Sequence, residues 1–171
     1  ALKATNTEAK SPDNDLVIAI EGSVSSMDPA NIPDTNAISA TRGCYEMLVA
    51  FDENQEIQGQ LAESYEVSED SLTYTFHLRE GVKFTDGTDF NAAAVKANYD
   101  RIIDKENNLR QRRTFVVTGE DGSETYRVES IETPDDYTVV FKLTEPWAPF
   151  INRMTQICMI SPAALEEYGN D

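Results

Sequence analysis

Histidine is nearly absent from this chain: His77 is the only one in 171 residues, which restricts the groups available for acid–base catalysis. No P-loop, GxGxxG, HExxH or GxSxG motif occurs either, so carboxylates are the remaining candidate acids and bases. Asp86, Asp89 and Asp100 could form a glycosidase pair or a metal site, but their contexts suit a turn, a helix end and a surface. We therefore expect neither catalysis nor a cofactor, and keep an enzyme that uses carboxylates as an alternative hypothesis.

Cysteine is also scarce, because Cys44 and Cys158 are the only two and stand far apart in the sequence. Neither belongs to a CxxC pair or to a Cys/His spacing typical of zinc sites, so the sequence predicts no metal centre. Two interpretations of the thiols stay open. They could form a disulfide, or they could be small buried hydrophobic side chains.

Long apolar runs are missing, since none approaches the roughly 20 residues that a membrane-spanning helix needs. Polar residues dominate positions 1–14, which we interpret as a flexible tether without a hydrophobic signal core. If the gene product is exported, we expect its signal peptide or lipid-bearing cysteine to lie outside this sequence or to have been removed.

Basic residues are few: 14 Lys and Arg stand against 31 Asp and Glu, and the formal net charge is −17. Such a charge repels phosphate backbones and anionic lipid surfaces, so we expect no nucleic-acid partner. The acidity is explained either by a well-solvated surface or by electrostatic capture of cationic ligands.

The clearest structural signals lie between residues 61 and 104. Alternating side chains around a polar turn at residues 68–71 predict an antiparallel hairpin over 61–78. Gly81 and Gly87 supply turns that can take a positive φ, and Asn91 is placed to cap a helix that runs to Asp104. None of these residues has the character of a catalyst.

The segments on either side carry weaker signals. Residues 16–20 are continuously apolar, which predicts a strand buried on both faces, and a polar loop over 23–35 follows it. Ile38, Cys44, Tyr45 and Leu48 then follow helical spacing. Beyond residue 104, the patterns predict a hairpin over 114–131, a strand over 137–143, a short helix over 147–154, a brief strand over 157–160 and a helix from Ser161 to Gly169.

Four stretches of the chain, taken in order, carry one family resemblance: Ser26-Met27-Asp28-Pro29, LAESYEVSEDSLTYTFHLREGVKFTDGTDFNAAAVKANYDR at 61–101, FKLTEP at 141–146 and ISP at 160–162. Together they resemble the family 5 solute-binding proteins, which are the extracytoplasmic receptors of ABC importers for dipeptides, oligopeptides, glutathione and nickel chelates. The block LREGVKFTDGTDFNAAAVKAN is most similar to the glutathione and dipeptide receptors.

The resemblance implies an α+β fold of the periplasmic-binding-protein-like type II class, with this chain as the N-terminal part of lobe I and its inserted antiparallel subdomain. It divides the chain into the tether (1–14), the first strand, cleft loop and helix of lobe I (15–52), and the inserted α+β subdomain (53–171). Because family members are several times longer, we expect the second lobe to lie outside this sequence.

For a binding site, the resemblance points to the loop after Asp28-Pro29, which in the oligopeptide-binding relatives lines the cleft between the lobes. Counting without gaps places that stretch at Pro33, Asp34 and Thr35, and Met27 precedes it. Arg112 is a further candidate because a guanidinium fork holds carboxylates well. Each assignment has a structural alternative: the loop could only cap the next helix, and the arginines around Arg112 could form a solvated helix end.

The function implied by the resemblance is that of the solute-binding component of an ABC importer, in the periplasm or as a lipoprotein outside the cytoplasmic membrane. It would capture a small peptide or related solute and deliver it to the permease, as a monomer at full length. This fragment could associate through its apolar strand at 16–20. A receptor for nickel chelates or other solutes, and a non-transport protein-interaction module, are the alternatives.

Overall fold

The computed structural model describes residues 24, 26–32, 38–39, 41 and 43–169. The tether, the strand expected over 16–20 and three candidate site residues, Pro33, Asp34 and Thr35, lie outside the described residues. Among the residues that are described, no helix combines the length and the apolar character needed to cross a bilayer.

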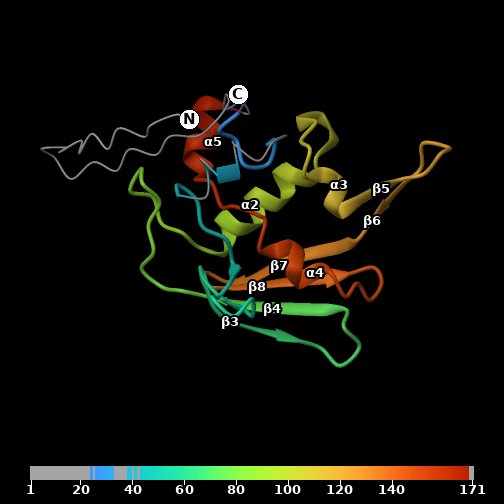
Figure 1. Cartoon of the computed structure of the whole chain (residues 1–171), viewed down its shortest axis with the longest axis horizontal. Coiled ribbons are helices and arrows are strands. Elements are labelled where there is room, and N and C mark those ends of the chain that lie inside the picture. The colour runs from blue at the N-terminus through green and yellow to red at the C-terminus, as the bar shows by residue number, and fades with distance from the viewer. Residues whose placement is uncertain (1–23, 25, 33–37, 40, 42, 170–171) are drawn as a thin grey trace, which may run out of the picture.

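A four-stranded antiparallel sheet with the order β3-β4-β8-β7 forms the lower layer of the fold in the view of Figure 1, with α2 (Ala92–Ile103) above it. The predicted hairpin over 61–78 is confirmed as the β3–β4 pair, and the strand predicted over 137–143 is confirmed as β8. β4 also pairs with β8, with Tyr74 opposite Phe141. The strands are β3 (Ala62–Val67), β4 (Thr73–Leu78), β7 (Val128–Asp135) and β8 (Thr138–Leu143).

One face of this sheet forms the core. Alternate residues of β4 and β8 are buried, and the side chains between them are half-buried on the opposite face. α2 (Ala92–Ile103) lies across the buried face (Figure 1), where the Tyr99 and Phe141 rings are 4.8 Å apart. A one-residue slip of either strand would expose its whole apolar set, so burial fixes the register. The buried strand residues are Tyr74, Phe76, Leu78, Val139, Phe141 and Leu143.

The N-caps predicted for α2 and α5 are confirmed. The Asn91 side chain accepts a hydrogen bond from the Ala94 amide at 2.9 Å, and α2 ends before Asp104. Ser161 caps α5 (Pro162–Tyr168), which ends at Gly169 with a φ of 72°. Each cap satisfies backbone groups that the helix itself leaves unpaired.

The remaining elements extend this core. β1 (Val49–Phe51) pairs with β2 (Ile57–Gly59), and the boundary expected between residues 52 and 53 falls in the turn that joins them; the division stays a prediction. β5 (Val116–Thr118) and β6 (Glu124–Tyr126) form a hairpin that projects from the body (Figure 1). The other helical elements are η1 (Lys105–Asn107), α3 (Arg112–Phe115) and α4 (Phe150–Met154).

The hairpin predicted over 114–131 was wrong at both ends. Residues 112–115 are helical, and the later run is divided between β6 and β7 at Arg127. The Arg127 amide donates to the Phe115 carbonyl at 2.8 Å, and its carbonyl accepts from Thr144 at 3.0 Å. These tertiary hydrogen bonds turn the chain from one sheet into the other, which a local pattern does not reveal.

Three further boundaries differ from expectation. The helical spacing through Leu48 was misleading, because the chain turns at residues 43–44, where the Cys44 and Tyr45 amides both donate to the Thr41 carbonyl. The strand predicted over 157–160 is reduced to one bridge between Met47 and Cys158. The helix predicted over 147–154 begins only at residue 150, directly after a proline.

Candidate functional site

The 26–32 loop folds through its own polar groups. The Asp28 carboxylate accepts a hydrogen bond from the Ala30 amide at 3.0 Å, and the Asp28 carbonyl accepts one from Asn31 at 3.0 Å. The Asp28 amide in turn donates to the Ser26 hydroxyl at 3.1 Å. Pro29 pre-sets the φ of the turn, so the Asp-Pro dipeptide specifies this local conformation.

Three contacts attach the loop to the body of the protein. Arg101, in the last turn of α2, binds the Asp28 carboxylate at 2.6 Å, and both side chains are only 9% exposed. The Gln111 amide donates to the Ala30 carbonyl at 3.0 Å, and the Tyr45 hydroxyl donates to the Met27 carbonyl at 3.3 Å. The loop is therefore held from α2, from the start of α3 and from the segment before β1.

Met27 differs from its neighbours because its side chain is free to meet another molecule. It is 48% exposed, whereas Pro29 and Ala30 are buried. Its backbone is held by Tyr45, so the loop presents this flexible apolar side chain from a fixed position. Solute contact by Met27 stays a prediction.

A cavity of about 340 Å³ lies beside the loop. Its walls combine apolar side chains with amide and hydroxyl groups, which is the composition typical of small-molecule sites. Four parts of the chain line it, namely the loop, the segment before β1, the residue before α3 and the segment after α4: Pro29, Ile32, Ile38, Thr41, Met47, Gln111, Thr155, Gln156 and Cys158.

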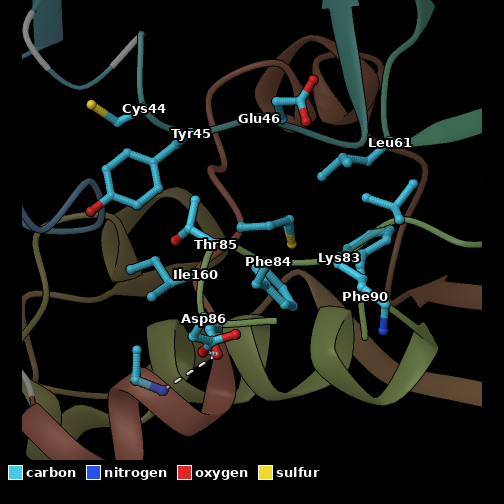
Figure 2. Close-up of a pocket in the computed structure, with 14 residues that line it drawn as sticks. Cys44, Tyr45, Glu46, Leu61, Lys83, Phe84, Thr85, Asp86, Phe90 and Ile160 are labelled. Atoms are coloured by element: carbon cyan, nitrogen blue, oxygen red, sulfur yellow. Dashed lines mark hydrogen bonds between the residues drawn. The ribbon is translucent and has the colours of Figure 1, made fainter. Parts of the chain in front are cut away.

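A second pocket, of about 260 Å³, lies between the segment before β1 and the turns that precede α2 (Figure 2). Leu61, Phe84 and Phe90 contribute apolar surface to it. Its Lys83 ammonium is paired with Asp89, and its Asp86 carboxylate accepts hydrogen bonds from within the chain. The Lys83 charge is therefore compensated by Asp89, and the Asp86 charge is stabilised by hydrogen bonds from the protein itself.

Two residues of this pocket have displaced pKa values. Hydrogen bonds from the Ser161 and Thr88 hydroxyls lower the pKa of Asp86, because they stabilise the charged form. Burial raises the pKa of Tyr45, and the nearby Cys44 and Asp28 add to that shift. Both groups keep their usual charge states at neutral pH, so neither is tuned as an acid or a base for catalysis.

The Arg112 side chain lines a separate hollow together with Lys105, Asn108 and Val116. Its guanidinium binds the Glu124 carboxylate through two hydrogen bonds of 2.9 Å and donates to the Ile103 carbonyl at 2.8 Å. The hydrogen bond from Arg112 lowers the pKa of Glu124. These contacts join α3 and β6 to the end of α2, and solute binding by Arg112 stays a prediction.

The two cysteines, both within the described part of the chain, are not joined by a disulfide. Cys44 is exposed, so its interpretation as a buried hydrophobic side chain was wrong, while Cys158 is half-buried. Among the described residues, no group of three or more His, Cys, Asp and Glu side chains is arranged to hold a metal ion.

Sequence reasoning missed Arg101, Tyr45 and Gln111, which anchor the loop. Arg101 carries one local signal, a basic residue in the last turn of a helix, but that signal indicates dipole complementarity and names no partner. The Gln111 contact uses a backbone amide, which every non-proline residue has. The fold alone brings these three positions to the loop.

Comparison with known proteins agrees with this architecture. Residues 56–171 match the model of the bacterial extracellular solute-binding proteins, family 5 Middle. The chain is 40% identical over 159 residues to the glutathione-binding protein GsiB of Escherichia coli (strain K12). The alignment covers 92% of this chain but only 29% of GsiB.

Solved structures show the same likeness. The PBP AgaA of A. tumefaciens R10, in complex with agropinic acid, superimposes with a TM-score of 0.75 at 32% identity, over 85% of this chain and 28% of that chain. The ABC transporter-associated periplasmic binding protein DppA of Helicobacter pylori, in complex with peptide STSA, gives 0.65 at 31% identity, over 84% and 30%. The expected α+β fold of type II periplasmic binding proteins is confirmed.

Proposed function

This chain belongs to the family 5 bacterial extracellular solute-binding proteins, and on that ground we propose that the protein is the solute-binding component of an ABC importer. It captures a small peptide or a peptide-like solute such as glutathione and delivers it to the membrane permease. The observation that carries the proposal is the 40% identity to a glutathione-binding protein over 92% of the chain. The protein acts outside the cytoplasmic membrane, in the periplasm or as a lipoprotein, and makes and breaks no bond in its solute.

The geometry around the 26–32 loop supports this function. We propose that the solute contacts Met27 and the stretch Pro33, Asp34 and Thr35, which follows the loop directly. A loop held in place before the solute arrives loses little conformational entropy on binding, so more of the contact energy appears as affinity. Closure of a second lobe over the solute would exclude water and report occupancy to the permease.

The test is a titration of the full-length gene product with glutathione, a dipeptide and a nickel–histidine chelate, read by calorimetry and melting temperature. We expect glutathione or the dipeptide to bind, and a solute at a hundredfold excess over Kd to stabilise the protein by about 2.7 kcal/mol. Met27→Ala should weaken binding, whereas Val67→Ala, a change at a similarly exposed apolar residue of β3 (44% against 48%), should not.

Two outcomes would change the conclusion. Binding of the nickel chelate alone would favour the alternative receptor of the same family. Absence of binding to both glutathione and the dipeptide would contradict the proposed substrate class.

A further inference from the structure

The ion pair between Asp28 and Arg101 joins two segments that stand 73 residues apart in the sequence. The pair is bidentate: Arg101 Nη2 lies 2.6 Å from Asp28 Oδ2, and Arg101 Nη1 lies 3.3 Å from Asp28 Oδ1. Both side chains are 9% exposed, whereas the Lys96–Asp100 pair on the same helix is 41% and 50% exposed. Within the described part of the chain, the Asp28–Arg101 pair is thus the most shielded from water.

Shielding makes this pair a geometric constraint. An exposed pair contributes little because water competes for both charges, but a shielded carboxylate that loses its partner is left without solvation. The planar guanidinium fork also restricts the orientation of the carboxylate that it binds. Arg101 therefore determines where the two oxygens of Asp28 lie.

The orientation of Asp28 is passed on to the loop. The same Oδ1 atom that faces Arg101 accepts the hydrogen bond from the Ala30 amide, and Ala30 is itself buried at 3% exposure. The backbone of Arg101 is itself fixed. Its neighbour Ile102 is buried in the core, and the Asn107 side chain donates a hydrogen bond to the Arg101 carbonyl at 2.9 Å. A continuous set of contacts thus connects the core helix α2 with the turn of the 26–32 loop.

We propose that Arg101 is a positioning residue of the solute site: through Asp28 it holds the 26–32 loop in the conformation that binds solute, and it does so without touching the solute. The inference rests on the proposed function for its effect on affinity. A loop released from the pair has to be ordered each time solute binds, and that ordering cost lowers the affinity.

The first experiment measures hydrogen exchange in the full-length gene product without solute, so it does not depend on the identity of the solute. In Arg101→Gln, the Ala30 and Asn31 amides should exchange about tenfold faster or more, while the amides of β4 and β8 stay within about twofold of wild type. Asp100→Asn is the matched control, because it removes an exposed pair one residue earlier on the same helix and should leave the loop amides unchanged.

Two exchange results would overturn the inference: loop amides that keep their wild-type rate, or equal acceleration of loop and sheet amides, which would make the pair a contributor to global stability only. If Arg101→Gln does not fold, the nearly isosteric Asp28→Asn takes its place, since its amide oxygen can still accept from Ala30.

The second experiment titrates the same variants with glutathione and a dipeptide as probes. Arg101→Gln and Asp28→Asn should bind about tenfold more weakly than wild type. Arg101→Lys should recover part of the loss, and Asp100→Asn should bind as wild type does. Unchanged affinity in Arg101→Gln would contradict the inference. If wild type binds neither probe, the proposed function fails, while the exchange experiment still decides whether Arg101 positions the loop.

Discussion

The Asp86 carboxylate accepts a hydrogen bond from the Ser161 hydroxyl, which stands 75 residues further along the chain. The same carboxylate accepts from the Thr88 amide at 2.8 Å and from the Thr88 hydroxyl at 2.6 Å. The Ser161 hydroxyl oxygen also lies 3.4 Å from the Ala164 amide in the first turn of α5. Asp86 therefore connects the turn before α2 to the beginning of the last described helix.

This network makes part of the stability depend on pH. Because the folded-state pKa of Asp86 is lowered, first by Ser161 and then by Thr88, its contribution is present above the ordinary carboxyl pKa and is lost as the pH falls through the folded value. We expect Asp86→Asn to lower the melting temperature at neutral pH, and the difference from wild type to shrink in acid. Circular dichroism melts across the acid range measure this. A difference that stays constant over the range would contradict the prediction, and Ser161→Ala should show the same trend as Asp86→Asn.

A second prediction concerns the turn at Gly87, where φ is +87°. Gly87→Ala should destabilise the protein by about 1–2 kcal/mol, because an L-residue is strained in this conformation even though no atom crowds the new Cβ. Gly43→Ala is the control, since Gly43 also has open space around its Cβ position but no positive φ. Urea unfolding midpoints compare the two variants. Equal effects would show that the turn at Gly87 does not require glycine.

A third prediction concerns the aromatic core. Phe141 is fully buried, and its ring lies 5.7 Å from Phe76 and 5.6 Å from Phe150. Phe141→Ala should cost about 3–5 kcal/mol because it opens a cavity between α2 and the sheet. Phe51→Ala makes the same chemical change at a position that is 46% exposed, and it should cost far less. Chemical denaturation measures the free energy of unfolding of both variants. If the two variants lose similar amounts of stability, Phe141 is not part of the stabilising core.

A fourth prediction concerns Asn98, a buried polar residue of α2. Its side chain accepts from the Ile160 amide at 3.0 Å, donates to the Ile160 carbonyl at 2.8 Å and donates to the Ala94 carbonyl at 2.9 Å. Asn98→Leu should cost about 2 kcal/mol, because the Ile160 backbone groups lose their partner. Asn152→Ala, at an exposed helical position, is the control. Retention of full stability by Asn98→Leu would show that water replaces the amide.

Local chemistry in the sequence was sufficient for several elements. The hairpin over 61–78, the start of α2 at Asn91 and the limits of α5 at Ser161 and Gly169 were all predicted and are confirmed. Each depends on groups only a few residues apart: an alternating strand, a side chain that caps its own helix, or a glycine in a turn. The Ser26-Met27-Asp28-Pro29 stretch likewise marked the loop, because its turn is made by its own polar groups.

Some strand edges and charged side chains have many possible partners in the sequence, and only the tertiary structure decided which partner each one has. The free edge of β4 could pair with any strand, the Asp28 carboxylate with any guanidinium, and the Arg112 guanidinium with a solute or with a protein carboxylate. The folded core brings β8, Arg101 and Glu124 to these three places. Sequence alone determined which chemical groups the chain carries and which local turns they make, whereas burial of the aromatic face of the sheet against α2 selected the long-range partners.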